Sequence, residues 1–92
     1  MREIDYSTQF QRDYKRESKS PKNKDLDKKL ELVLDLLCVD LPLTRKYKDH
    51  SLRGEYDQIR ECHIKPDLLL MYFKTGKSLL TLVRLGSHSE LF

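Results

Sequence analysis

The chain has 92 residues, of which 36% are charged and 38% are hydrophobic, and its formal net charge is +3. A chain of this length forms one domain and buries roughly 60–65% of its unfolded surface, which is enough for one modest core. The hydrophobic share excludes a disordered polyampholyte, and the mild basic excess suits an acidic partner such as nucleic acid. We therefore expect a single domain over residues 1–92.

The two cysteines, Cys38 and Cys62, form no C-x-x-C pair, so a disulfide-rich scaffold is not indicated. The segment from Met1 to Asp5 lacks the apolar stretch of a signal peptide. No apolar run approaches the length of a membrane span. These features together favour a protein of a reducing cytoplasm, without a membrane partner.

A short strand and a helix are expected first. Residues 2–6 alternate in polarity, which predicts the strand, and Thr8 with Gln11 has the spacing of a capping box for the helix. That helix carries Phe10 and Tyr14 four residues apart and is otherwise charged. It should lie on the surface with one thin apolar stripe.

The second helix has the clearest pattern in the chain. Ser20 can cap it, Pro21 can occupy its first position, and Pro42 ends it. Its apolar residues recur at a helical period and are Leu26, Leu30, Val33, Leu34 and Leu37. The two helices, joined by a short polar turn, should form an antiparallel hairpin.

Three strands are predicted after a basic loop that spans residues 43–53. They cover residues 55–64, 68–73 and 78–85. Tyr56 and Ile59 are out of step in the first of them, which indicates a bulge. The order β-α-α-β-β-β predicts an α+β fold, in which the helix hairpin packs on one face of a small, mainly antiparallel four-stranded sheet. The other face is left for function.

Three histidines are the residues best suited to chemistry. His50, His63 and His88 each lie in a loop or strand-end segment that also holds an acid and a Lys or Arg. Histidine transfers protons near neutral pH, and the neighbouring cations suit an anionic substrate. This pattern favours a proton-transfer site over core packing.

Several neighbours of the histidines allow two interpretations. Asp67 follows Pro66 at a hairpin end, where it either orients His63 or makes a turn contact. Arg84 lies in an apolar strand, so it either forms a structural ion pair or binds an anion. Lys48 and Arg53 are candidate substrate contacts in the loop around His50, although such loops are often merely solvated. The terminal Phe92 could stack on a base.

The sequence contains neither the ligand spacing of a zinc site nor a glycine-rich phosphate-binding loop. No H-x3–5-H or C-x2–4-C pair occurs, and zinc sites usually contain one. The glycines Gly54, Gly76 and Gly86 form no phosphate-binding loop. We expect neither a metal nor another cofactor.

Three segments of the chain carry specific motifs. Tyr47–Gly54 contains K-D-H-x-L-x-G, Arg60–Tyr72 contains R-[DE]-x-H-[IV]-x-P-D, and Arg84–Phe92 contains G-[ST]-H-x-x-L-F. Over nearly its whole length the chain resembles the bacterial YafQ toxins of the RelE/ParE superfamily. One departure is Leu68, at which some relatives have Trp, so a stacking role there does not carry over.

The resemblance implies the toxin of a type II toxin–antitoxin system, a ribosome-dependent mRNA endonuclease that inhibits translation. Its implied partners are the ribosome with mRNA and an antitoxin of ribbon-helix-helix type, through which alone it would meet operator DNA. The active-site positions that it implies are His50, His63, Asp67, His88 and Phe92.

The chemistry of RNA agrees with this assignment, because the 2′-OH can attack the adjacent phosphorus without a metal. We assign His88 as the general acid, and Asp67 with His63 to the base side. Arg84 and Lys48 are candidates for stabilising charge on the phosphoryl oxygens. Two alternatives stay open: a ParE-like toxin that binds DNA gyrase without nuclease activity, and a domain that binds RNA without cutting it.

Overall fold

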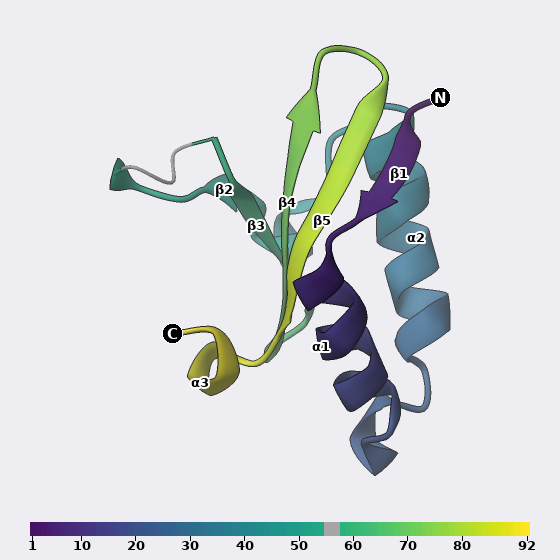
Figure 1. Ribbon diagram of the computed structural model, residues 1–92, viewed down its shortest axis with the longest axis vertical. Helices are drawn as coiled ribbons and strands as arrows, with labels where there is room; N and C mark the ends of the chain where they lie inside the picture. Colours follow the sequence, from purple (N-terminus) through teal and green to yellow (C-terminus); the bar gives the residue numbers. More distant parts are fainter. Residues whose placement is uncertain (55–57) are drawn as a thin grey trace.

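The computed structural model describes residues 1–54 and 58–92, and it has the predicted α+β architecture. Figure 1 shows the two long helices on one side of a twisted sheet. The strands are β1 (Glu3–Tyr6), β2 (His50–Ser51), β3 (Arg60–Lys65), β4 (Leu68–Thr75) and β5 (Leu79–Gly86). The helices are α1 (Thr8–Ser18), α2 (Leu26–Cys38) and α3 (His88–Leu91), with 3-10 turns η1 (Pro21–Asn23) and η2 (Arg45–Tyr47).

The sheet is mixed, and within the described residues it has five strands where four were predicted. Its order is β1-β5-β4-β3-β2. β1 runs parallel to β5 after the helical crossover, whereas the remaining pairs are antiparallel. The additional strand, β2, lies in the segment predicted as a loop. It has only two residues, too few for a sequence period, and it exists because β3 pairs with it.

Helix α1 begins one residue earlier than the capping-box spacing predicted. Ser7 is the N-cap, and its Oγ accepts a hydrogen bond from the backbone N of Phe10 at 2.9 Å. Gln11 instead donates to the carbonyl of Tyr6. Phe10 is buried, as the apolar stripe predicted, but Asp13 is buried as well.

Helix α2 confirms the periodic pattern, because all five predicted apolar residues are buried. Its start differs from the prediction: Pro21 opens the separate 3-10 turn η1, and α2 begins only at Leu26. Its end also precedes Pro42. Asp40 adopts the left-handed conformation (φ 59°), and Leu41 donates to the carbonyl of Leu36 in a Schellman arrangement.

Strand β3 begins at Arg60, later than predicted, and residues 55–57 of the predicted strand lie outside the described residues, as does the Tyr56 half of the predicted bulge. The described register shifts occur elsewhere, between His63 and Lys65 and opposite the Met71/Tyr72 step of β4. Both shifts change where side chains point at the end of the sheet that meets α3.

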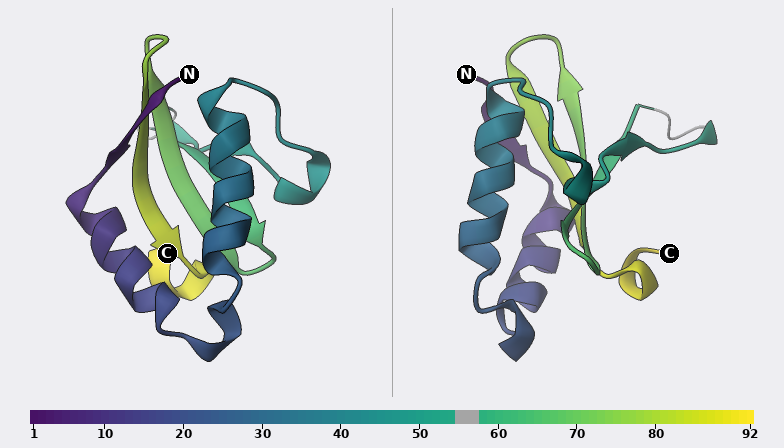
Figure 2. Two further views of the ribbon diagram at one scale, coloured as in Figure 1. Left: turned by 90° about the vertical axis from the view of Figure 1, so that its right-hand side faces the viewer. Right: turned by 180° about the vertical axis from the view of Figure 1, so that it is seen from behind.

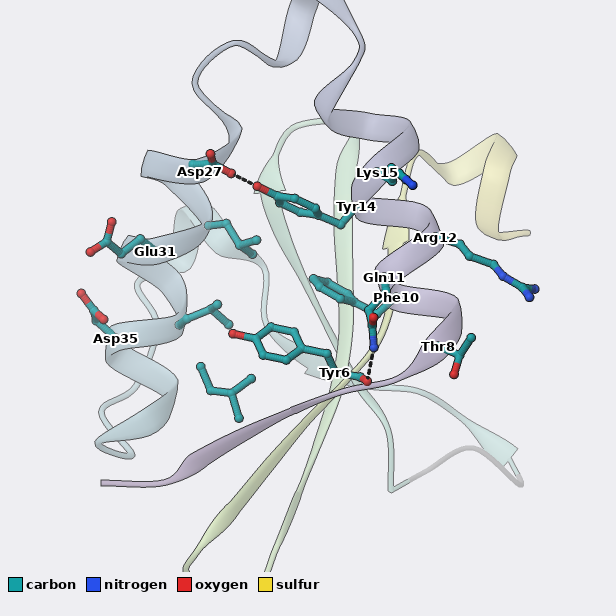
Figure 3. A pocket seen from close by; sticks show the side chains of 13 residues that line it. Tyr6, Thr8, Phe10, Gln11, Arg12, Tyr14, Lys15, Asp27, Glu31 and Asp35 are labelled. Carbon is teal, nitrogen blue, oxygen red and sulfur yellow. Dashed lines mark hydrogen bonds between the residues drawn. The ribbon is translucent and has the colours of Figure 1, made fainter.

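The core lies between the helices and the sheet, and Figure 2 shows that α1 and α2 cover the same face. The two helices diverge, leaving an apolar groove of about 820 Å3 between them. In Figure 3 the hydroxyl of Tyr14 donates across this groove to Asp27. Within residues 1–54 and 58–92, none of the helices has both the length and the apolar content that a membrane crossing requires.

Candidate active site

Asp67 and His88 form the centre of the candidate site, where the β3–β4 turn meets α3. The Asp67 Oδ1 atom lies 3.1 Å from the backbone N of His88 and 2.9 Å from its Nδ1. An ionised carboxylate only accepts hydrogen bonds, so Nδ1 carries the hydrogen and Nε2 is left for proton transfer. The side-chain hydrogen bond from His88, with the backbone one, lowers the pKa of Asp67 below its usual value of 3.8.

His63 lies beside this pair. The His63 and His88 rings meet edge to face with their centroids 5.6 Å apart. The Nδ1 atom of His63 is 3.3 Å from the carbonyl oxygen of Pro66, which again directs its Nε2 away from the turn. From the sequence, Asp67 either orients His63 or makes a turn contact; the structure pairs this carboxylate with His88.

Phe92 completes the cluster. It lies one helical turn after His88, and its ring centroid is 6.5 Å from that of His88. Its side chain is exposed, at 72% for the whole residue. An exposed aromatic ring beside an acid–base pair suits the stacking role predicted from the sequence.

His50 reaches the same face of the sheet through β2, directly opposite Glu61 of β3. Glu61 and His63 are two residues apart on β3, so their side chains point to the same face of the sheet. His50 is therefore a diagonal neighbour of His63, at about 7–8 Å between their Cα atoms. The Nε2 atom of His50 is 3.5 Å from Glu61 Oε1. Glu61 is 4% exposed, and its Oε2 atom has no hydrogen-bond partner among the described residues. His50 therefore lies at the margin of the site, next to a buried acid.

The loop that carries Lys48 is tied to the sheet by its neighbour Asp49. This carboxylate accepts from Arg60 at 3.1 Å and from the Tyr72 hydroxyl at 2.6 Å. Lys48 adopts the left-handed conformation (φ 48°), and its carbonyl oxygen is 2.7 Å from Nδ1 of His50. A hollow of about 380 Å3 joins this loop to His63, and its cationic lining is Lys29, Lys46, Lys48 and Lys65.

Of the two interpretations of Arg84, the structure shows the ion pair, because its guanidinium pairs with Asp13 of α1 at 2.7 Å. Asp13 also accepts from the backbone N of Leu85 at 3.0 Å. Burial alone would raise the pKa of Asp13, but the bonds from Arg84 and Leu85 outweigh it and lower the value. The structure thus supports the ion-pair alternative. Arg53 is exposed in the loop after β2.

Some residues near the site escaped the sequence analysis. Glu61 shares a strand face with His63, so the alternation pointed to it, although its burial could not be foreseen. Arg16 and Glu90 meet at 3.0 Å between α1 and α3. Nothing in the local pattern of the chain links two residues so far apart in sequence.

The residues near the site offer no obvious metal centre. Across the part of the chain that the structure describes, no three His, Cys, Asp or Glu side chains are grouped closely enough to hold a metal ion. Asp67 and His88 are close, but they form a hydrogen bond with each other.

Comparisons with known proteins agree with the geometry. A family model described as the bacterial toxin of a type II toxin–antitoxin system, YafQ, matches residues 2–92. The mRNA interferase toxin YafQ of Escherichia coli K12 is 41% identical over 91 residues, covering 99% of this chain and 96% of that protein.

Solved structures give the same result. A metal-bound toxin from Helicobacter pylori is 48% identical, with a TM-score of 0.87 and 100% of both chains covered. The toxin of the E. coli DinJ–YafQ complex is 40% identical, with a TM-score of 0.84 over 100% of this chain and 99% of that one. Matches in sequence and structure along the full length show that the chain belongs to the YafQ family of type II toxin–antitoxin toxins.

Proposed function

We propose that this toxin is a metal-independent endoribonuclease that cleaves mRNA on the ribosome and so inhibits translation. The observation that carries the proposal is the Asp67–His88 pair with the His63 ring 5.6 Å from that of His88. The E. coli relative that is 41% identical bears the name mRNA interferase, which supports the same substrate class.

The two histidines can divide the proton transfers of RNA cleavage. His63 takes the proton of the 2′-OH through Nε2, and the 2′-oxygen attacks the adjacent phosphorus. Protonated His88 gives its Nε2 proton to the 5′-oxygen as the P–O bond breaks, which leaves a 2′,3′-cyclic phosphate and a 5′-OH. General acids and bases act within about 3 Å of their oxygens, and two rings this close can serve two oxygens on one phosphorus.

Asp67 works through His88 in this scheme. Its contacts with His88 lower its pKa, so near neutral pH it is a charged acceptor rather than a base. It fixes the Nδ1–H tautomer and the orientation of the His88 ring, which leaves Nε2 for the proton transfer. Lys48 and the cationic hollow beside His63 then hold the phosphates, Phe92 stacks on a base, and His50 is a second acid–base or phosphate contact.

Dependence on the ribosome follows from how open the site is. The side chains of His88 and Asp67 are 56% and 65% exposed, so the toxin alone encloses little of an RNA strand. Much of a catalytic rate comes from holding the reacting atoms in line. The ribosomal A site, which already orients the message, supplies that alignment.

A cognate antitoxin is the second expected partner. Two of the solved structures of the E. coli relative are complexes with DinJ, so we propose a matching antitoxin here, of ribbon-helix-helix type. Through it alone the toxin would meet operator DNA. Because the proposed target is the ribosome, we expect the toxin to act in the bacterial cytoplasm.

The decisive experiment incubates the purified toxin with translating ribosomes and maps the ends of the message. We expect new 5′-OH ends within A-site codons, and none on free message at the same toxin concentration. Intact message together with inhibited gyrase supercoiling would instead establish the ParE-like alternative, and intact message with retained RNA binding would establish the non-cleaving one.

Metal independence is tested in the same assay, with ribosomes kept intact by Mg²⁺ and the toxin stripped beforehand by EDTA. Cleavage should be unchanged, because both proton transfers use histidines. A related H. pylori toxin is metal-bound, so Zn²⁺ and Cu²⁺ are added back in separate reactions. Activity that is lost on stripping and restored by one of these ions would contradict the proposal.

A further inference from the structure

Helix α3 is a single turn, and an isolated turn of helix is unstable in water. Its own capping box fixes its shape: Ser87 Oγ accepts from the backbone N of Glu90, and Glu90 Oε1 accepts from the backbone N of Ser87 at 2.8 Å. These bonds are local to the turn. The orientation of α3, and therefore of His88, depends on what joins it to the rest of the molecule.

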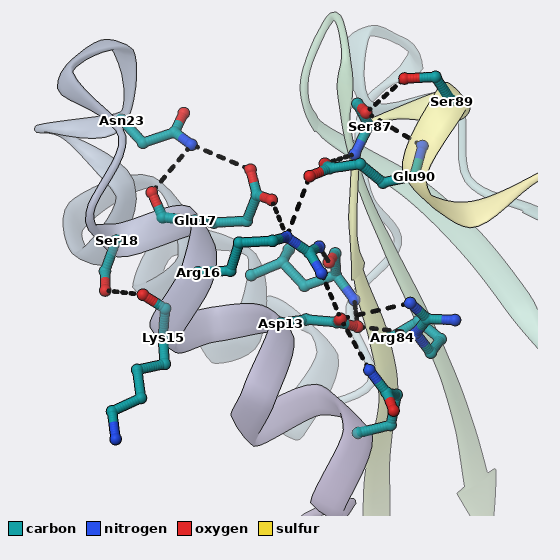
Figure 4. A network of polar contacts seen from close by, with 12 residues as sticks. Asp13, Lys15, Arg16, Glu17, Ser18, Asn23, Arg84, Ser87, Ser89 and Glu90 are labelled. Atoms are coloured by element: carbon teal, nitrogen blue, oxygen red, sulfur yellow. Dashed lines mark hydrogen bonds and ion pairs between the residues drawn. The ribbon is translucent and has the colours of Figure 1, made fainter.

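Two polar attachments flank the turn. On one side Asp67 accepts hydrogen bonds from the backbone N and the side-chain Nδ1 of His88. On the other side Arg16 of α1 meets Glu90, with its Nε 3.0 Å from Glu90 Oε2 (Figure 4). Without the second contact, α3 could pivot about the first.

Arg16 is itself firmly held, as Figure 4 shows. Its Nη1 donates to Asp13 Oδ1 at 3.0 Å, its Nη2 to the carbonyl oxygen of Leu85 at 3.0 Å, and its Nε to Glu17 Oε2 at 2.9 Å. One guanidinium thus connects the helix hairpin, the backbone of β5 and the turn that carries His88. Such a fork of planar donors is specific to arginine.

Gly86, which lies between β5 and α3, leaves room for this close approach. A Cβ atom there would lie 3.0 Å from Arg16 Nη2 and 3.2 Å from a methyl of Leu91. The charges also support the contact. The backbone N–H of Ser87 is the main cause that lowers the pKa of Glu90, and the charge of Arg16 makes a smaller contribution in the same direction, so Glu90 is ionised near neutral pH.

We infer that Arg16 is a positioning residue for RNA cleavage, which holds α3 through Glu90 and thereby aims His88 and Phe92 at the substrate. The inference rests on the proposed role of His88. It assigns a catalytic consequence to a residue of the helix hairpin, on the far side of the sheet from the histidines.

The test uses Arg16→Gln, Arg16→Lys and Glu90→Gln in the full chain, with Lys15→Gln as the control on the same helix. Glu90→Gln keeps the capping box, because Gln serves at this position too. Each variant is assayed for ribosome-bound mRNA cleavage, with turnover and half-saturating ribosome concentration measured separately. The titration of the Asp67 carboxyl is followed by NMR.

We expect turnover to fall about tenfold in Arg16→Gln and Glu90→Gln, since a small misplacement of a catalytic group costs up to about 10²-fold. Half-saturation should change less than about twofold, Arg16→Lys should recover part of the loss, and Lys15→Gln should match the parent. The midpoint of Asp67 should rise toward 3.8 in both Gln variants, because its contact with His88 loosens.

Parental turnover and an unchanged Asp67 midpoint in Glu90→Gln would overturn the inference, while His88→Ala separately tests the proposed function. A raised midpoint with parental turnover would overturn both, because His88 would then move without consequence. If Arg16→Gln fails to fold, Glu90→Gln decides alone, since Glu90 lies on the exposed terminal turn.

Discussion

The two faces of the sheet use charged side chains in opposite ways. On the helix-covered face, Asp13 is fully buried and its carboxylate is saturated by Arg84, Arg16 and the backbone of β5. On the open face, the side chains of Asp67 and His88 are more than half exposed. Within the described residues, the rings of His63 and His88 each form a hydrogen bond only through Nδ1. Groups that hold the fold together are fully partnered, whereas groups suited to chemistry keep one atom for the substrate.

The cavity with the greater volume of the two described is not the one that lies beside the histidines. The apolar groove of about 820 Å3 lies between α1 and α2, on the face away from the histidines, and its polar rim is Arg12, Lys15, Asp27, Glu31 and Asp35. The hollow beside His63 is less than half that volume but is lined by cations. The open face and the buried core beneath the helices therefore predict separate effects: substitutions on the open face should change activity, and those in the core should change stability.

The largest effect is expected from His88→Ala. Loss of a general acid should lower cleavage by about 10³-fold, within the usual range for such groups. The melting temperature should stay close to that of the parent, because the His88 side chain is exposed. Ribosome-bound cleavage and circular dichroism measure the two quantities, and parental cleavage by this variant would refute the acid assignment.

Leu26→Ala should give the opposite result. Leu26 is 1% exposed at the start of α2, and truncating such a residue costs about 3 kcal/mol in the free energy of unfolding. Cleavage per folded molecule should match the parent well below the unfolding transition. Urea titration measures the loss of stability; a variant that is stable but inactive would break the separation between the two faces.

Asp67→Asn tests how the open face works. Asn still suits the turn and can accept from the backbone of His88, but it lacks the carboxylate charge beside the His88 ring. Cleavage should fall by about 10²-fold, and the pH optimum should move, while stability changes little. Asp5→Asn, on the exposed first strand, is the control. Parental activity with an unchanged pH profile would reduce Asp67 to a turn residue.

The smallest effect is predicted for Asp40→Asn on the helix side. Arg2 and then Lys74 lower the pKa of Asp40 from 3.8 to about 2. A lowered pKa stabilises the fold above about pH 4, and this contribution disappears as the pH falls through about 2. Asn tolerates the left-handed backbone at this position, so only the charge is lost. Urea midpoints should differ slightly at pH 7 and converge near pH 2; equal midpoints at both pH values would show that the charge contributes nothing.

Much of this protein could be predicted from its sequence. The period of Leu26, Leu30 and Val33 predicted α2 and its buried face, because helical spacing is local. Turn residues at Pro66 and Gly76 separated the meander strands. The motifs around the three histidines identified the family, which the comparisons confirmed.

Only the tertiary structure decided the partners of the charged groups. Asp67 meets His88 rather than His63, Arg84 pairs with Asp13, and His50 joins a fifth strand. These contacts join residues distant in sequence. They depend on strand register and on the two register shifts, and a shift of one residue turns a side chain to the other face. Local periodicity determines which residues are buried, whereas the register determines which of the remaining side chains can meet.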